Sequence, residues 1–194
     1  MASSLTSFTI EQPAWLGEAA PIGERYAAAE DRVGLAIALA GRNVEAGTGG
    51  PFGAAVFERA TGRLVAAGVN VVVPSGLSIA HAEVVALSLA QSAVGSFDLR
   101  RGPSSEGYEL ATSAEPCVMC LGAIHWSGIR SVVAAARDAD VRAIGFDEGP
   151  KPGDWSATLQ AAGIDSAAGI RRAEAVAVLE RYRDRSGQIY NAGG

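Results

Sequence analysis

Hydrophobic residues recur along this chain with two different spacings. Helical spacing covers residues 22–40, 80–94, 117–127 and 174–183, with weaker signals at 139–144 and 157–162. Short, nearly continuous apolar runs at 51–57, 64–73, 108–113 and 131–136, and a weaker one near Ile170, predict five strands. Because strands and helices alternate, the pattern predicts an α/β fold with three layers, α/β/α, around a central mixed five-stranded sheet.

Glycine and proline separate these elements without dividing the chain into two domains. Turn residues gather at 43–50, at the hairpin turn 59–62 and in the loop 145–155. Residues 1–21 are polar and contain Pro13 and Pro21, so we predict a loosely ordered N-terminal extension, with Trp15 as the residue that could dock on the body. Residues 22–194 are predicted to form a single domain, since 194 residues with 48% hydrophobic content suffice for one core.

Two short stretches far apart in the sequence carry side chains that can hold a metal. Residues 81–83 read His-Ala-Glu, and residues 116–120 read Pro-Cys-Val-Met-Cys. Cys117 and Cys120 are three positions apart, so one helical turn presents both sulfurs on the same side. A catalytic zinc takes three nitrogen or sulfur ligands and keeps a fourth position open. We therefore predict that His81, Cys117 and Cys120 bind Zn²⁺.

Glu83 follows His81 by two positions, which is roughly 200° around a regular helix and a poor place for a fourth ligand. If a helix begins here, both side chains can still border one pocket at its end. Glu83 is then the acid and base of the site. A chain that used its metal only for structure would spend a fourth ligand instead of keeping such a carboxyl.

Charge and cysteine usage limit the partners and the compartment. The net charge of −5 argues against binding to long stretches of nucleic acid. The chain has only two cysteines, and both belong to the predicted metal site, so we expect no disulfide and a cytoplasmic location. No signal peptide or membrane-spanning segment is expected from the apolar pattern.

Together the two stretches resemble the signature of the zinc-dependent nucleobase deaminases, H-x-E followed by P-C-x-x-C, which have the cytidine-deaminase-like fold. This resemblance implies hydrolytic removal of an amino group from a ring carbon. Glu83 would take a proton from the attacking water, pass it to a ring nitrogen and then help to protonate the departing ammonia.

Within this superfamily the chain is most similar to the guanine deaminases, over residues 26–148. The similarity lies in GGPFGA at 49–54, Val-Asn at 69–70, HAEV at 81–84, EPCVMCLGAI at 115–124, Trp126 and GFDE at 145–148. It implies that guanine is converted to xanthine and ammonia, with ammeline as a further substrate. It also implies that Phe52 stacks on the base, Asn70 bonds the purine edge, Trp126 lines the pocket and Glu148 contacts the base and assists proton transfer.

Three further positions are implied by the same resemblance. Ala82, between His81 and Glu83, and Asp147, beside Glu148, are expected to border the substrate. Tyr190 is expected to close the pocket of a partner, if a homodimer exchanges C-terminal segments from about residue 185. The chain departs from the bacterial pattern by having Asp147-Glu148 where two aspartates are usual, so the pocket could take a smaller ring.

Other interpretations stay open at this point. The run EPCVMC at 115–120 and the run ARDA at 136–139 also look like tRNA adenosine deaminases, although these lack GFDE and bind RNA through clustered basic residues. Cytosine or a nucleoside is an alternative substrate, and a zinc protein without catalysis is an alternative of another class. Phe52 and Trp126 could simply pack in the core, Asp147-Glu148 could be a solvated loop, and Tyr190 could belong to a frayed end. His125 is not expected to bind the metal.

Overall fold

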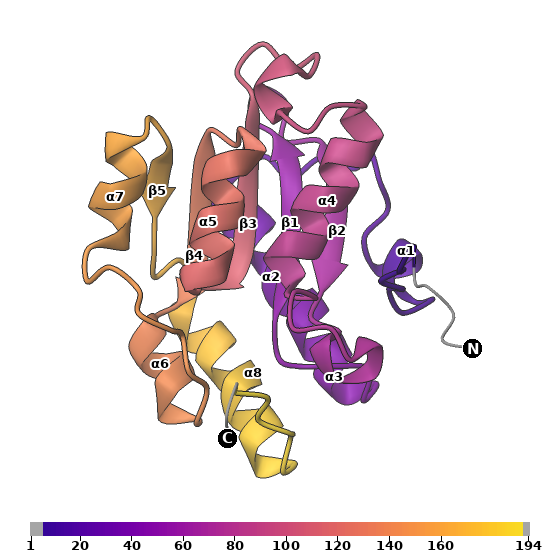
Figure 1. The fold of residues 1–194 in the computed structure, drawn as a ribbon, viewed down its shortest axis with the longest axis vertical. Helices are drawn as coiled ribbons and strands as arrows, with labels where there is room; N and C mark the ends of the chain where they lie inside the picture. The colour runs from indigo at the N-terminus through magenta and orange to yellow at the C-terminus, as the bar shows by residue number, and fades with distance from the viewer. Residues whose placement is uncertain (1–5, 192–194) are drawn as a thin grey trace.

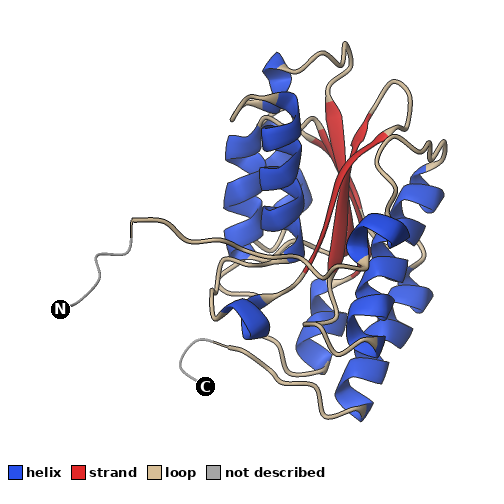
Figure 2. Cartoon of the chain, turned by 90° about the vertical axis from the view of Figure 1, so that its right-hand side faces the viewer, coloured by secondary structure: helices blue, strands red, loops and turns tan. Residues whose placement is uncertain are grey.

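A single mixed sheet forms the centre of the computed structural model, which describes residues 6–191. Its order is β2-β1-β3-β4-β5, and its strands are β1 (Gly53–Glu58), β2 (Leu64–Val69), β3 (Tyr108–Ala114), β4 (Ser131–Ala136) and β5 (Asp165–Ala167). Strand β1 runs antiparallel to β2 and β3, whereas β3, β4 and β5 are parallel. Helices cover both faces, so the three-layer fold predicted from the sequence is confirmed (Figures 1 and 2).

The strands alternate in which face they present, and this alternation divides the core in two. In β1, Ala55 and Phe57 belong to a cluster packed under α2 (Ala29–Glu45) and α8 (Arg172–Asp184). Ala54 and Val56 point the other way, into a cluster under α4 (Ala82–Val94) and α5 (Val118–Ser127). Burial of both faces explains why the central strands read as continuous apolar runs. The shorter helices are α1 (Leu16–Ala19), α3 (Val72–Ser75), α6 (Asp138–Ala143), α7 (Trp155–Ala161) and a 3₁₀ turn (Leu99–Arg101).

Helices α4 and α5 begin at the same end of the sheet, beyond the C-terminal ends of β2 and β3. This places the two metal-binding stretches together. His81 is the N-cap of α4, and Cys117 is the N-cap of α5. The two helices lie side by side on one face of the sheet (Figure 1). Strand β3 ends at Ala114, so the run through Pro116 carries the chain directly from the central strand to the start of α5.

Three predicted elements differ from the structure. Helix α2 begins at residue 29 instead of 22, because Gly23 and Tyr26 donate backbone hydrogen bonds to the hairpin carbonyls of residues 64 and 62 (both 2.9 Å) and stay extended. The strand predicted at 64–73 ends at Val69. The Oδ1 of Asn70 accepts a bond from the backbone N–H of Val72 (3.2 Å), and the short helix α3 follows. The last strand lies at 165–167, before Ile170.

The part of the N-terminal extension that the structure describes packs on the domain instead of being loosely ordered. Leu16 and Ala20 are buried in the core under α2. The side-chain oxygen of Gln12 accepts a bond from the backbone N–H of Val69 (2.7 Å), and Trp15 donates to the hydroxyl of Thr48 (3.3 Å). Residues 1–5 and 192–194 lie outside the described residues. Across residues 6–191, no helix combines the length and the apolar character needed to cross a membrane.

Candidate metal centre and active site

The N-terminal ends of α4 and α5 bring three side chains together, those of His81, Cys117 and Cys120. The Nδ1 atom of His81 lies 3.5 Å from the Sγ of Cys117 and 3.6 Å from the Sγ of Cys120. Tetrahedral zinc holds nitrogen at about 2.1 Å and sulfur at about 2.3 Å, which puts neighbouring ligand atoms about 3.6 Å apart. All three ligand atoms lie within 4.8 Å of one another, so the donor set and its spacing fit Zn²⁺.

The pKa values of the two thiols are shifted in opposite directions. A hydrogen bond from Cys120, with a further contribution from His81, lowers the pKa of Cys117 to about 4. The neighbouring thiolate and burial raise the pKa of Cys120 well above its ordinary value. Without metal, the pair therefore shares one proton, which binding of a divalent cation would release.

The ligand ring and the neighbouring carboxyl are both buried close to these sulfurs. Burial alone would lower the pKa of His81, but Cys117, Glu83 and Glu148 outweigh it and raise that pKa. Glu83 sits in the first turn of α4 with 6% of its surface exposed. Burial, and then the negative charge of Cys117, raise its pKa, so this carboxyl takes up a proton readily. The helix therefore does begin where His81 and Glu83 can border one site.

Glu148 brings a second buried carboxyl to the same place. It lies in the loop after α6 with 7% of its surface exposed. Its backbone carbonyl accepts a bond from the N–H of Val118 (3.1 Å), which ties the loop to the start of α5. Burial, together with the charges of Cys117 and Glu83, raises the pKa of Glu148 to about 8.

Asp147 points away from this site, which corrects the substrate contact expected for it. Its side chain is 65% exposed and forms an ion pair with Arg142 (3.1 Å). The same oxygen accepts a bond from the backbone N–H of Gly149 (3.0 Å). Asp147 therefore closes the turn that directs Glu148 inward.

Asn70 and Phe52 lie on neighbouring loop ends, where the backbone N–H of Asn70 donates to the carbonyl of Phe52 (3.0 Å). Asn70 is 1% exposed, and its Nδ2 is buried with no hydrogen-bond partner among residues 6–191. An amide left in this state offers a donor to a ligand. Phe52 is partly buried and packs edge-on against Phe146 with 5.2 Å between ring centroids.

Tyr190 lies over the site of its own chain. Its ring packs on Phe146 at 4.8 Å, and its hydroxyl is buried without a partner in the part of the chain that the structure describes. The hydroxyl approaches Gly50 so closely that any side chain at that position would collide with it. Burial, then Tyr182 and then the carboxyls Glu83 and Glu148, raise the pKa of Tyr190.

Two other predicted contacts are placed differently from expectation. The side chain of Ala82 is fully buried in the core under α4, so only its backbone is free to meet a substrate. Trp126 is 81% exposed on α5. It follows Cys117 by nine positions, which is roughly 180° around the helix, so it faces outward from its own chain's metal site. His125 is also exposed and lies 5.4 Å from the Trp126 ring.

Asn43 is a supporting residue that the sequence analysis did not single out. It is fully buried near the end of α2, and its Nδ2 donates to the backbone carbonyls of Gly50 and Asn70 (both 2.8 Å). Its Oδ1 accepts a bond from the hydroxyl of Thr48 (2.7 Å). The available signal was an amide at a helical position directly before a glycine-rich turn. Its bonds hold the two loop ends that carry Phe52 and Asn70.

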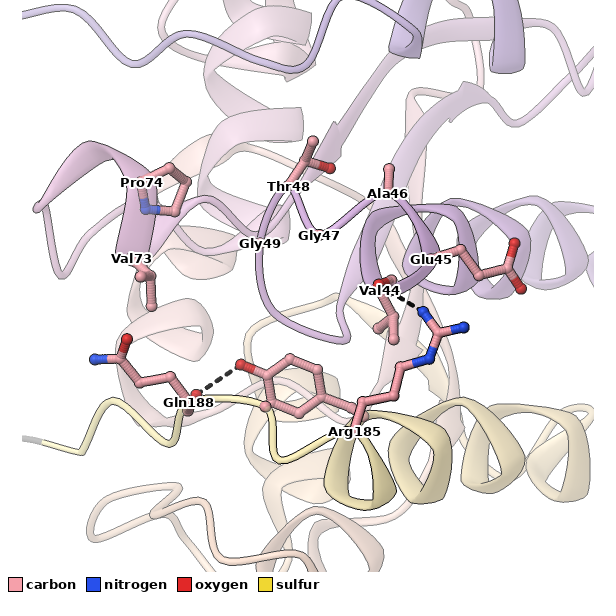
Figure 3. Close-up of a pocket in the computed structure, with 12 residues that line it drawn as sticks. Val44, Glu45, Ala46, Gly47, Thr48, Gly49, Val73, Pro74, Arg185 and Gln188 are labelled. Carbon is pink, nitrogen blue, oxygen red and sulfur yellow. Dashed lines mark hydrogen bonds between the residues drawn. The ribbon is translucent and has the colours of Figure 1, made fainter.

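A surface cleft of about 490 Å³ opens between the loop after α2, helix α3 and the C-terminal segment (Figure 3). Gly49 and Pro74 line one side, and Arg185 and Gln188 line the other. Neither the metal ligands nor Glu148 belong to its lining. The cleft therefore borders the outer side of the segment that carries Tyr190.

Comparison with known proteins agrees with this geometry. The family described as the cytidine and deoxycytidylate deaminase zinc-binding region matches residues 28–136. The guanine deaminase of Bacillus subtilis is 42% identical over 113 residues, 58% of this chain and 67% of that protein.

Two solved structures extend the similarity over nearly the whole chain. The protein NE0047 in complex with 2,6-diaminopurine is 50% identical, with a TM-score of 0.88, over 95% of this chain and 96% of that one. A guanine deaminase from Nitrosomonas europaea is 49% identical, with a TM-score of 0.87, over 92% of this chain and 97% of that one. The resemblance seen in the sequence and the zinc cofactor are thereby confirmed. The chain belongs to the cytidine and deoxycytidylate deaminase zinc-binding family and is a zinc-dependent hydrolase.

Proposed function

We propose that this enzyme deaminates guanine, giving xanthine and ammonia, and that it accepts ammeline as a further substrate. The observation that carries the proposal is the second buried carboxyl, Glu148, placed beside the metal ligands and Glu83. Guanine and ammeline both present an amidine-like edge with adjacent N–H donors, which a carboxylate can accept as a pair. The similarity to guanine deaminases from two bacteria supports the same choice.

The chemistry assigned to the chain is movement of protons around an attacking water. His81, Cys117 and Cys120 would hold the zinc, which would lower the pKa of a bound water toward neutrality and so supply the nucleophile. Glu83 accepts the proton of that water and delivers it to the ring nitrogen next to the attacked carbon. It then assists protonation of the amino group as the carbon–nitrogen bond breaks. One water is consumed, and one ammonia leaves.

Recognition of the base is assigned to groups that face the same space. Glu148 accepts the N–H pair, and the unpartnered Nδ2 of Asn70 donates to an acceptor on the purine edge. Phe52 covers one face of the ring, and Tyr190 closes the mouth of the site. Closure by a side chain of the same subunit leaves little room for a sugar, which favours a free base over a nucleoside.

The test is ammonia release from the zinc-loaded enzyme with guanine, ammeline, guanosine, adenine, cytosine and cytidine, each at the same concentration. We expect turnover concentrated on guanine, with ammeline second. Activity on cytosine or a nucleoside with guanine inert would overturn the assignment of the base-binding residues. Inosine formed in radiolabelled tRNA, with guanine untouched, would favour a tRNA adenosine deaminase instead.

Removal of the metal is expected to destabilise the protein as well as to stop turnover. A ligand present at about 1,000 times its Kd stabilises the folded state by about 4 kcal/mol. For a chain of this size, that loss corresponds to a fall in Tm of roughly 10 °C. Calorimetry before and after chelation, followed by readdition of Zn²⁺, measures the shift. An unchanged Tm after verified loss of zinc would contradict a site that couples α4 to α5.

We also propose a cytoplasmic homodimer. A thiolate pair reserved for zinc calls for a reducing compartment, which supports the location. The support for a dimer is an apolar patch made of Phe97 (75% exposed) and Trp126 (81% exposed), which border one cleft of about 460 Å³ on the outer side of α4 and α5. Large exposed aromatic residues gathered in one patch are typical of subunit interfaces.

Replacing Trp126 with aspartate is expected to convert the dimer to a monomer, because the patch would have to bury a charge. Light scattering after size exclusion measures the mass. Ile22→Asp is the matched control, since Ile22 is 63% exposed but lies outside the patch. A Trp126→Asp protein that remained dimeric would place the interface elsewhere.

A further inference from the structure

The C-terminal segment is tied down on both sides of Tyr190. Before it, the hydroxyl of Tyr182 donates to the backbone carbonyl of Gln188 (2.6 Å), and Arg185 donates to the carbonyl of Val44 (3.3 Å). Both bonds are dashed in Figure 3. After it, the side chain of Asn191 bonds the loop that carries Glu148.

Asn191 makes two bonds to that loop. Its Oδ1 accepts from the backbone N–H of Asp147, and its Nδ2 donates to the backbone carbonyl of Gly145 (both 2.9 Å). An amide side chain offers a donor and an acceptor side by side, so it can satisfy both backbone groups at once. Alanine could satisfy neither of them, and aspartate only the N–H.

The loop that carries Glu148 is fixed by other contacts as well. The two bonds of Asn191 therefore hold the C-terminal segment to the loop, and the loop does not depend on them. The carbonyl of Glu148 is bonded by the N–H of Val118 (3.1 Å). Arg142 contacts Asp147 (3.1 Å) and donates to the carbonyl of Gly149 (3.1 Å). Beyond the loop, the buried ammonium of Lys151 lies 3.3 Å from a carboxylate oxygen of Glu115, two residues before Cys117. Loss of Asn191 would leave these contacts in place.

We infer that Asn191 is a positioning residue: it fastens the tail to the Glu148 loop and so keeps Tyr190 over the substrate. The inference rests on the proposed function, because Tyr190 is taken to close the site around a base. Asn191 is adjacent to Tyr190, so the clamp acts one residue from the ring that it positions. A tail that spends less time closed would bind substrate more weakly in proportion to the lost closed population.

The test is Asn191→Ala in the zinc-loaded enzyme, with guanine as the substrate. Two amide hydrogen bonds justify a rise in KM of about tenfold, and kcat should stay within about twofold because the Glu148 loop keeps its own contacts. Gln188→Ala is the matched control on the same segment, since Gln188 gives only its backbone carbonyl to Tyr182. It should leave both constants unchanged.

A double-mutant cycle separates positioning from general damage. If Asn191 acts through Tyr190, Asn191→Ala has no further effect on KM in a Tyr190→Ala background. Asn191→Asp keeps the acceptor for the N–H of Asp147 and should fall between Asn191→Ala and the unaltered enzyme.

Three outcomes would overturn the inference. They are an unchanged KM in Asn191→Ala, a fall confined to kcat, or an effect that persists in full without the Tyr190 ring. Failure of the unaltered enzyme to turn over guanine would instead refute the proposed function. That result would be distinguishable, since it appears before any variant is made.

Discussion

Replacing Glu83 with glutamine is expected to lower kcat by roughly 10²–10⁴-fold while leaving the zinc content unchanged. Positioned acid–base groups contribute this much, and glutamine keeps the size of the side chain without its ability to carry a proton. Glu83 lies in the first turn of α4 and is 6% exposed. Since His81, Cys117 and Cys120 already supply three ligands, metal binding should not need this carboxyl.

The measurement pairs initial rates of ammonia release with the zinc content of the same preparation. Glu180→Gln is the matched control, because Glu180 is exposed on α8 and lies outside the site. It should retain full activity. Loss of zinc in Glu83→Gln would make Glu83 a ligand or its support, and full turnover would assign the proton transfers to another group.

Each half of the metal centre could be predicted from the sequence because its chemistry is local. Cys117 and Cys120 share a helical turn, and their order after Pro116 sets the start of a helix. His81 and Glu83 lie at another helix start, where a regular helix angle no longer applies to the N-cap. Residues within one such stretch keep their relative positions in any fold that forms the helix.

The groups around the metal centre could not be placed in the same way, because their directions depend on distant backbone. Asp147 turns outward to Arg142 and Gly149, which only the folded loop brings together. Trp126 is an exception, because its outward direction follows from its angle from Cys117 on α5. Tyr190 is placed by a segment whose Asn191 bonds the loop after α6. None of these relations follows from residue type alone.

The pairing of backbone N–H and carbonyl groups explains the remaining differences from the predicted elements. The N–H groups of Gly23 and Tyr26 bond hairpin carbonyls, which delays the start of α2. Asn43, inside the last turn of the same helix, satisfies the carbonyls of Gly50 and Asn70. Buried backbone groups must be paired, and the sequence does not reveal which distant side chain pairs them.

Replacing Glu148 with glutamine is expected to lower kcat/KM for guanine by roughly 10²–10⁴-fold. Each hydrogen bond to a charged group contributes about 1.5–3 kcal/mol, and two N–H groups of the base would lose a carboxylate acceptor. The amide of glutamine would also turn a donor toward a donor. Glu148→Asp keeps the charge on a shorter side chain and should recover part of the activity.

The pH dependence gives this prediction its sharpest form. Burial and the charges of Cys117 and Glu83 hold the pKa of Glu148 at about 8 in the metal-free chain. A bound cation lowers the pKa of a nearby carboxyl, so the value in the zinc enzyme should lie between its ordinary one and about 8. Only the ionised form accepts the N–H pair, so activity should be lost as pH falls through this range. Because Glu83 must also be ionised to act as a base, two protonations oppose activity on the acid side.

A plot of log kcat/KM against pH should therefore rise with a slope of about two on its acid limb in the unaltered enzyme. In Glu148→Gln the slope should fall to about one, since Glu83 alone then titrates. The two carboxyls influence each other, so the apparent pKa values belong to the pair and not to either residue. The slope depends only on how many protons the pair takes up, which is two in either case. An acid limb with the same slope in both proteins would mean that Glu148 does not act in its ionised form. Glutamine at full activity would remove Glu148 from base recognition and with it the main support for guanine as the substrate.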